Sequence, residues 1–164
     1  MLRAAREAVG RSQTEVAAAA GVSARTVRRM EAAEGDVGFD TLGAVHDFLE
    51  TQGVQFLEPH GAEDWSLVFR TALAPSPDSR STRKRPFDPA PGRVLRTARV
   101  LIAASQEALA EQANIAQTTV RRLEHSGPDV SPELAFRLQS HLQAVGVDIR
   151  KPDSKFGWRI YLRR

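Results

Sequence analysis

The sequence has no cysteine in its 164 residues, few aromatic side chains and no long apolar run. The absence of cysteine excludes a disulfide framework, a thiol nucleophile and a thiolate metal site. The apolar run Val16–Ala20 is far too short to span a membrane, and Met1–Glu7 contains no apolar segment of a secretory signal. These absences predict a cytoplasmic protein that makes no contact with a membrane.

Residues that would carry catalysis are equally sparse. None of the four histidines has metal-ligand spacing to another, and no Ser/His/Asp arrangement, phosphate-binding loop or pair of carboxylates stands out from the background. We therefore expect no catalytic activity, no metal and no cofactor. The histidines are His46, His60, His125 and His141.

Charge is divided unevenly along the chain. Residues 1–70 carry 7 basic and 11 acidic side chains, a net of −4, whereas residues 93–164 carry 12 and 7, a net of +5. All but three of the basic residues are arginine, whose planar fork suits phosphates and guanine edges. A GC-rich genome would give the same arginine bias, so composition favours a nucleic-acid ligand without identifying one.

A second copy of the first 70 residues follows at a fixed offset of 93. Residues 2–70 align without a gap on residues 95–163, and 21 of the 69 positions are identical. The longest shared stretch is Thr26–Glu31, which returns as Thr119–Glu124 with a single substitution. The sequence therefore predicts two copies of one unit, and whatever that unit binds can be bound twice.

Residues 71–92 separate the two predicted domains, which span residues 1–70 and 93–164. The segment holds five of the nine prolines and almost no large apolar side chain, which predicts a disordered linker. A flexible chain of this length typically spans roughly 25 Å. Its basic cluster Arg83-Lys84-Arg85 fits a phosphate-contacting or minor-groove arm, and a solvated charge run explains it equally well.

Each copy is predicted to begin with four helices. Ser12–Glu15 is a capping box that opens the second helix, Gly21 ends that helix, and Ser23 caps the third. In the second copy Asn114 replaces Gly21 as the next-best residue for a left-handed turn, and Ser131–Glu133 starts the fourth helix. The buried faces of the fourth helices are expected at Leu42, Val45, Phe48 and Leu49, and at Leu138, Leu142 and Val145.

The end of each copy changes to the two-residue period of β-strands. Trp65 and Trp158 each open an alternation of apolar and more polar side chains, and Val54–Glu58 and Val147–Lys151 precede them as expected partner strands. A lone hairpin is marginal in water, so this face must pack on the helices or on another hairpin. We expect both tryptophans in the core, and pairing of the two hairpins would hide their edge strands.

Two helices joined by a three-residue turn, with glutamine at the start of the first and two arginines in the second, resemble a helix-turn-helix. The residues that carry the resemblance are Arg6, Ser12-Gln13, Val16-Ala17, Gly21-Val22-Ser23 and Val27–Glu31, and then Arg99, Ser105-Gln106, Leu109-Ala110, Asn114-Ile115 and Val120–Glu124. Over residues 2–53 and 95–146 the chain is similar to the phage repressor and Cro family, also called the xenobiotic-response-element (XRE) family. The resemblance implies a mainly α fold with two lambda-repressor-like domains, each of about four helices, with a β-hairpin where the family usually has a fifth helix.

The resemblance also implies roles for individual residues. Gln13 and Gln106 match the glutamine that touches phosphate and supports the recognition helix, and Ser23 is expected beside a phosphate as well. The family's structural ion pair between the first and third helices is matched by Arg6 with Glu31 and by Arg99 with Glu124.

The exposed face of each third helix is the predicted base-reading surface. Val27 and Val120 face the core, so the residues on the opposite side of each helix can enter a major groove. The expected base-reading residues are Ala24, Arg25, Arg28 and Arg29 in the first copy, and Gln117, Thr118, Arg121 and Arg122 in the second. Because the two faces differ, they should prefer two unequal half-sites.

These observations favour a sequence-specific regulator that binds double-stranded DNA, a repressor that occupies a promoter. The resemblance implies bacterial or phage cytoplasm, with the protein nucleoid-associated when bound. One chain is expected to act as a pseudo-dimer through its hairpins, and a homodimer stays open. The acidic first copy fits an activator that contacts RNA polymerase, and the competing class is an antitoxin or adaptor in which the helix-turn-helix serves only as a scaffold for protein interaction.

Overall fold

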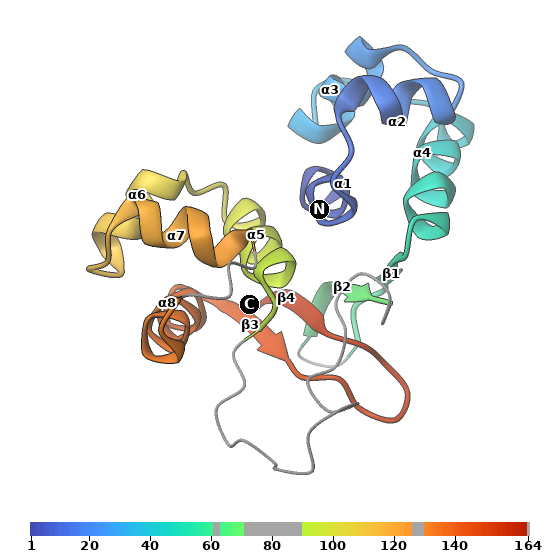
Figure 1. Cartoon of the computed structure of the whole chain (residues 1–164). Helices are drawn as coiled ribbons and strands as arrows, with labels where there is room; N and C mark the ends of the chain where they lie inside the picture. Colours follow the sequence, from blue (N-terminus) through green and yellow to red (C-terminus); the bar gives the residue numbers. More distant parts are fainter. Residues whose placement is uncertain (61–62, 71–89, 126–129, 164) are drawn as a thin grey trace.

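The computed structural model describes residues 1–60, 63–70, 90–125 and 130–163 (Figure 1). The elements beyond residue 90 repeat the order of the first six, helix by helix and strand by strand, and α6, α8 and β3 start and end 93 residues after α2, α4 and β1. In chain order the elements are α1 (Leu2–Val9), α2 (Gln13–Ala19), α3 (Ala24–Ala32), α4 (Phe39–Thr51), β1 (Val54–Leu57), β2 (Glu63–Phe69), α5 (Gly92–Leu101), α6 (Gln106–Gln112), α7 (Gln117–Glu124), α8 (Pro132–Ala144), β3 (Val147–Arg150) and β4 (Arg159–Arg163).

Local signals in the sequence explain where these helices begin and end. Ser12 accepts a hydrogen bond from the Glu15 backbone while the Glu15 carboxylate accepts from the Ser12 backbone, which is the predicted capping box. Gly21 and Asn114 both adopt the left-handed conformation that ends α2 and α6, with φ of 67° and 52°. Ser131 caps α8, which has proline at its first position as predicted.

The two hairpins form one four-stranded antiparallel sheet in the order β1-β2-β4-β3. The inner strands β2 and β4 come from different copies, so the sheet joins the two halves of the chain. The pairing of the hairpins that the sequence led us to expect is therefore present within a single chain. The two outer strands are only four residues long, and short edges limit pairing with other molecules.

The register of β2 on β4 is that of a two-fold interface. Leu67 pairs with Ile160, and these two residues occupy equivalent positions in the two copies because they are 93 residues apart. Ser66 pairs with Tyr161, and the equivalents of those two residues, Arg159 and Val68, pair with each other. Each partner therefore presents the same strand positions to the other, as in an isologous dimer interface.

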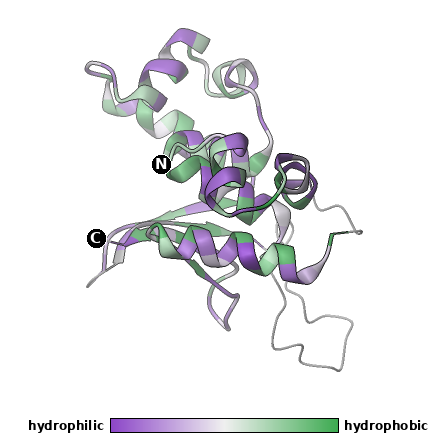
Figure 2. Cartoon of the chain, turned by 90° about the vertical axis from the view of Figure 1, so that its left-hand side faces the viewer, coloured by the Kyte–Doolittle hydropathy of each residue, from purple (hydrophilic) through white to green (hydrophobic). Residues whose placement is uncertain are grey.

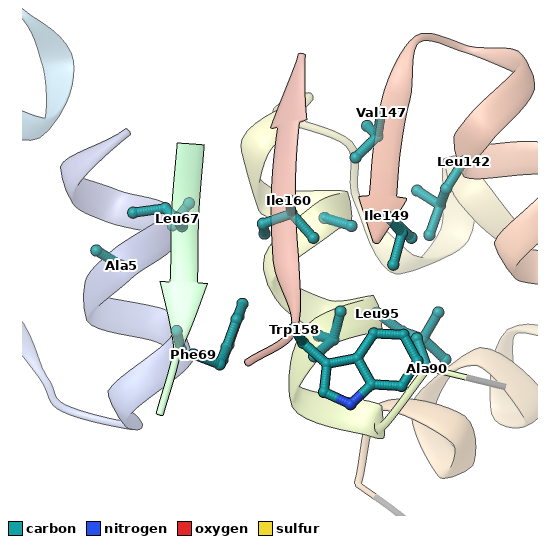
Figure 3. Packing of buried hydrophobic residues seen from close by; sticks show 14 of the residues in the cluster. Ala5, Leu67, Phe69, Ala90, Leu95, Leu142, Val147, Ile149, Trp158 and Ile160 are labelled. Atoms are coloured by element: carbon teal, nitrogen blue, oxygen red, sulfur yellow. The ribbon is translucent and has the colours of Figure 1, made fainter. Parts of the chain in front are cut away.

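Helices α1 and α5 pack against each other and against the sheet, and they lie side by side in Figure 1. Leu67 and Phe69 on β2 and Ile160 on β4 point toward these helices (Figure 3). Trp158 is fully buried and lies beside Leu95 of α5 (Figure 3). The described core is a single cluster that draws residues from both copies, which gives each modest unit a larger apolar interior than it could bury alone.

Helices in Figure 2 carry both hydrophilic and hydrophobic residues along their length. This is expected of helices that bury one side only. Helices α4 and α8 lie on opposite outer flanks of the molecule in Figure 1. Their outer faces are therefore separate surfaces of the same molecule.

The expectation that both tryptophans lie in the core is wrong for Trp65, whose exposed fraction is 44 % while that of Trp158 is 0 %. Between Glu63 and Ser66 the pairing of β2 with β4 shifts register, as at a β-bulge. An extra residue reverses the facing of the residues that precede it, so Trp65 leaves the face that holds Leu67.

Other side chains also depart from the predicted burial. Leu42 is 39 % exposed because the buried side of α4 begins at Val45. Val145 is 44 % exposed because it is the C-cap of α8, where helical periodicity ends. Tyr161, expected on the polar side of β4, is buried because its hydroxyl donates to Asp148 at 2.5 Å within a polar cluster.

The proposed linker lies almost wholly outside the described residues, which resume at Ala90. Ala90 is buried, and α5 begins at Gly92, one residue before the predicted start of the second domain. The two halves share one sheet and one core, and the domain boundaries at residues 70 and 93 remain predictions.

A methyl group on Gly157 should disrupt the pairing of the two halves. A Cβ at this position would stand 1.9 Å from the Phe69 carbonyl oxygen, a backbone atom that cannot rotate away as the end of a flexible side chain can. Gly157→Ala is expected to lower the free energy of unfolding by about 2 kcal/mol, as overpacking does, measured by urea titration. Gly43→Ala is the matched control, since nothing lies within 4 Å of its Cβ position; equal stability of the two variants would contradict the argument.

Candidate nucleic-acid interface

The helix-turn-helix geometry is present in both halves. In the first half α2 and α3 are joined by a turn through Gly21, and the Val22 backbone donates to the Ala17 carbonyl at 2.9 Å. In the second half Ile115 donates to Ala110 at 3.0 Å, the same bond 93 residues later. Equivalent backbone bonds give the two turns one shape.

The caps of these helices differ between the halves. Hydrogen bonds from the Ser12 backbone and hydroxyl, with a further bond from Arg11, lower the pKa of Glu15 to about 2. Ser105 caps α6 with its side chain, but Ala108 stands where Glu15 does and completes no capping box. Ser23 caps α3, whereas α7 has no side-chain cap, as its Ala116 predicts. The second helix-turn-helix is built with weaker ends.

A buried ion pair connects the first and third helices of each half, at the residues that the sequence singled out. The Arg6 guanidinium donates to both carboxylate oxygens of Glu31, at 2.6 and 3.1 Å. Arg99 donates to Glu124 in the same way, at 2.6 and 3.0 Å, and the Glu124 side chain is fully buried. Bidentate geometry satisfies these charges and sets the angle of α3 and α7 on α1 and α5.

The two predicted phosphate-contacting glutamines complete these clusters. Gln13 donates its amide hydrogen to Glu31 at 2.8 Å, and Gln106 donates to Glu124 at 2.7 Å. Each glutamine therefore connects the start of one helix of the motif to the end of the other. Ser23 uses its oxygen to cap α3, and the basic cluster at residues 83–85 lies outside the described residues.

The predicted reading face of α3 is only partly open. Ala24, Arg25 and Arg28 are exposed. Arg29 is half-buried, and its guanidinium lies 2.5 Å from the point where a Cβ on Gly35 would stand. Arg29 therefore extends over the loop after α3.

The predicted reading face of α7 is exposed at all four positions. Gln117, Thr118 and Arg121 line, together with Gln106, an open pocket of about 200 Å³. Arg122 is exposed beside them. The starts of α6 and α7 thus converge on one polar hollow with an arginine and two amides, groups that match guanine and adenine edges.

Contacts between the first helices of the two halves were not foreseen from the sequence. Arg96 of α5 forms an ion pair with Glu7 of α1, and Arg93 donates to the Ala8 carbonyl at 3.2 Å. The repeat gives no signal for the first contact, because the residue equivalent to Glu7 is Val100. Only the distribution of charge, acidic in the first copy and basic in the second, hints at it.

Within the part of the chain that the structure describes, no helix is long and apolar enough to cross a membrane. The same residues contain no group of three histidine, aspartate or glutamate side chains placed to hold a metal ion.

Comparison with known proteins identifies the first of these motifs. Residues 2–54, about a third of the chain, match a family model described as helix-turn-helix. No curated protein and no solved structure matches the chain. The match supports a DNA-binding transcription regulator in general, and that family is regulatory rather than enzymatic.

Removing one side of a buried ion pair should cost far more than removing one side of an exposed pair. Arg99→Ala leaves the Glu124 carboxylate buried and unpaired, which is expected to lower the free energy of unfolding by about 3 to 5 kcal/mol. Arg137→Ala is the control, because its pair with Glu133 is 47 % and 79 % exposed and should cost less than about 1 kcal/mol. Urea unfolding of both variants measures the two losses in the free energy of unfolding. Comparable losses would contradict a stabilising role for the Arg99–Glu124 ion pair.

Proposed function

We propose that this protein is a sequence-specific transcriptional repressor that reads two unequal DNA half-sites with one chain. The observation that carries the proposal is that the same arrangement of helices occurs in both halves. Two helix-turn-helix motifs, held by the same Arg–Glu–Gln cluster, each present an exposed helix with arginines on its outer face. An arginine can bind guanine O6 and N7 together, which suits this face to a major groove.

The two-fold register of β2 on β4 supports reading by a pair. Dimers of helix-turn-helix proteins read half-sites about 34 Å apart, one turn of the double helix, because their own symmetry matches that of the operator. Here the two-fold pair is formed within one chain, centred on Leu67 and Ile160. A single molecule would then occupy a promoter, and occupation alone is sufficient for repression.

The two reading faces predict an operator that is not a palindrome. The first half offers Arg25 and Arg28, with Arg29 turned toward Gly35, while the second offers Gln117 and Arg121 over an open hollow. The net charge is −4 for residues 1–70 and +5 for residues 93–164. The second half should therefore attract DNA phosphates more strongly than the first. The second half-site should therefore be the stronger one.

DNA selected from a random pool tests the proposal, followed by footprinting at nanomolar protein and by sedimentation of the complex. The expected result is a selected site with two different halves, protected over two adjacent major grooves by one chain. One chain that protects a single half-site would overturn the two-reader arrangement. A pool without enriched DNA would favour the protein-interaction module instead.

Arginines on α7 should matter more for DNA affinity than those on α3. Arg121→Ala and Arg122→Ala are expected to raise the Kd for the selected site by roughly 10- to 100-fold, since each good base contact contributes about 1–3 kcal/mol. Arg28→Ala and Arg29→Ala, the matched variants at equivalent positions, should raise it several-fold less. Titrations at one fixed salt concentration measure both pairs, and equal losses would count against the division of labour.

A further inference from the structure

One stretch of the first half contains no lysine or arginine of its own. Residues 30–69 contain nine carboxylates and neither lysine nor arginine, whereas the equivalent residues 123–162 contain five of each sign. The stretch includes all of α4, where Asp40 and Asp47 are exposed on the same edge, two turns apart. This edge repels DNA, and a partner with positive charge would fit it.

Apolar side chains lie at the start of the same helix. Phe39 is 91 % exposed, the most exposed of the large apolar residues described, and Leu42 one turn later is 39 % exposed. Single exposed apolar residues are common, but these two are neighbours on one helix face. Together they form an apolar tip on an acidic helix.

Gly43 makes a notch directly beside this tip. It follows Phe39 by four residues and so lies next to it on the helix surface. Nothing lies within 4 Å of the position that a Cβ would take, so no contact inside the molecule requires glycine here. Glycine in a helix interior lowers stability relative to alanine, and close approach of a partner gives a reason to keep it.

Helix α8 carries the complementary feature at the equivalent position. Phe136 occupies in α8 the place that Gly43 occupies in α4, and it is 53 % exposed. Arg137 follows it in the sequence, with an exposed 3.6 Å ion pair to Glu133 and a 3.4 Å hydrogen bond to the Asn114 carbonyl. A ring beside a positive charge on α8 thus corresponds to a notch beside negative charges on α4.

We propose that α4 of one molecule binds α8 of a second copy of this chain, with Phe136 seated over Gly43 beside Phe39. The two helices lie on opposite flanks of the molecule, so they cannot meet within one chain (Figure 1). The contact joins different surfaces and is therefore heterologous, which builds head-to-tail rows. Molecules bound at neighbouring DNA sites would hold each other in place, although the contact itself requires no DNA.

Sedimentation velocity of the full chain without DNA tests the contact. The expected result is weak association, at roughly 100 µM, as a small interface gives, and its loss as salt screens the charges. Gly43→Ala is expected to weaken association by about tenfold while raising the thermal midpoint, because the methyl group fills the notch and favours the helix. If Gly43 served only the fold, its substitution would not weaken association while raising the thermal midpoint.

Mixing two variants decides whether the contact is head to tail. Phe39→Ser should lose self-association through the α4 face, and Phe136→Ser should lose it through the α8 face. Their equimolar mixture should form one-to-one dimers that grow no further, because each variant retains one intact face. A wild-type chain that stays monomeric over this concentration range would overturn the proposal, as would a mixture that fails to associate. Site-specific DNA binding at nanomolar protein should be unchanged in both variants, so the proposed DNA function stands or falls separately.

Discussion

The antiparallel pairing of β2 with β4 is the contact on which the rest of the structure depends. Leu67 and Ile160 face each other at its centre from equivalent positions, and this register relates the two halves by a two-fold. The pairing brings α1 against α5 and merges two apolar interiors into one. Units of about 70 residues bury a modest fraction of their surface, so the shared core supplies stability that neither half could reach alone.

Within each half, the Arg–Glu–Gln cluster holds the helices of the motif at one angle. Buried ion pairs add little net stability compared with a well-packed apolar core, but a misplaced charge is costly, so they restrict the structure to the arrangement that satisfies them. The shortest hydrogen bond of the cluster, from arginine to glutamate, is 2.6 Å in both halves, while the residues on the outer face of the third helix differ. The same arrangement of helices therefore presents different side chains on its outer face in the two halves.

The sequence predicts most of the local structure, because caps and turns are short-range features. Ser12, Gly21 and Ser131 each do what their position indicates, and the repeat doubles the information. The ion pairs came from resemblance, since no local rule connects residues 25 positions apart. The exposure of Trp65 depends on a bulge, and the position of Arg29 depends on the loop beneath it. Such features follow from tertiary packing and leave no periodic signal.

The sheet that joins the halves is closed within one chain, which has a consequence for behaviour on dilution. A two-fold interface between separate molecules dissociates when the protein concentration falls below its Kd, so its stability depends on how much protein is present. Covalent connection makes the closure unimolecular, so dilution does not lower the local concentration of one half around the other. The pair of helix-turn-helix motifs therefore stays assembled even when a cell contains only a few copies of the chain.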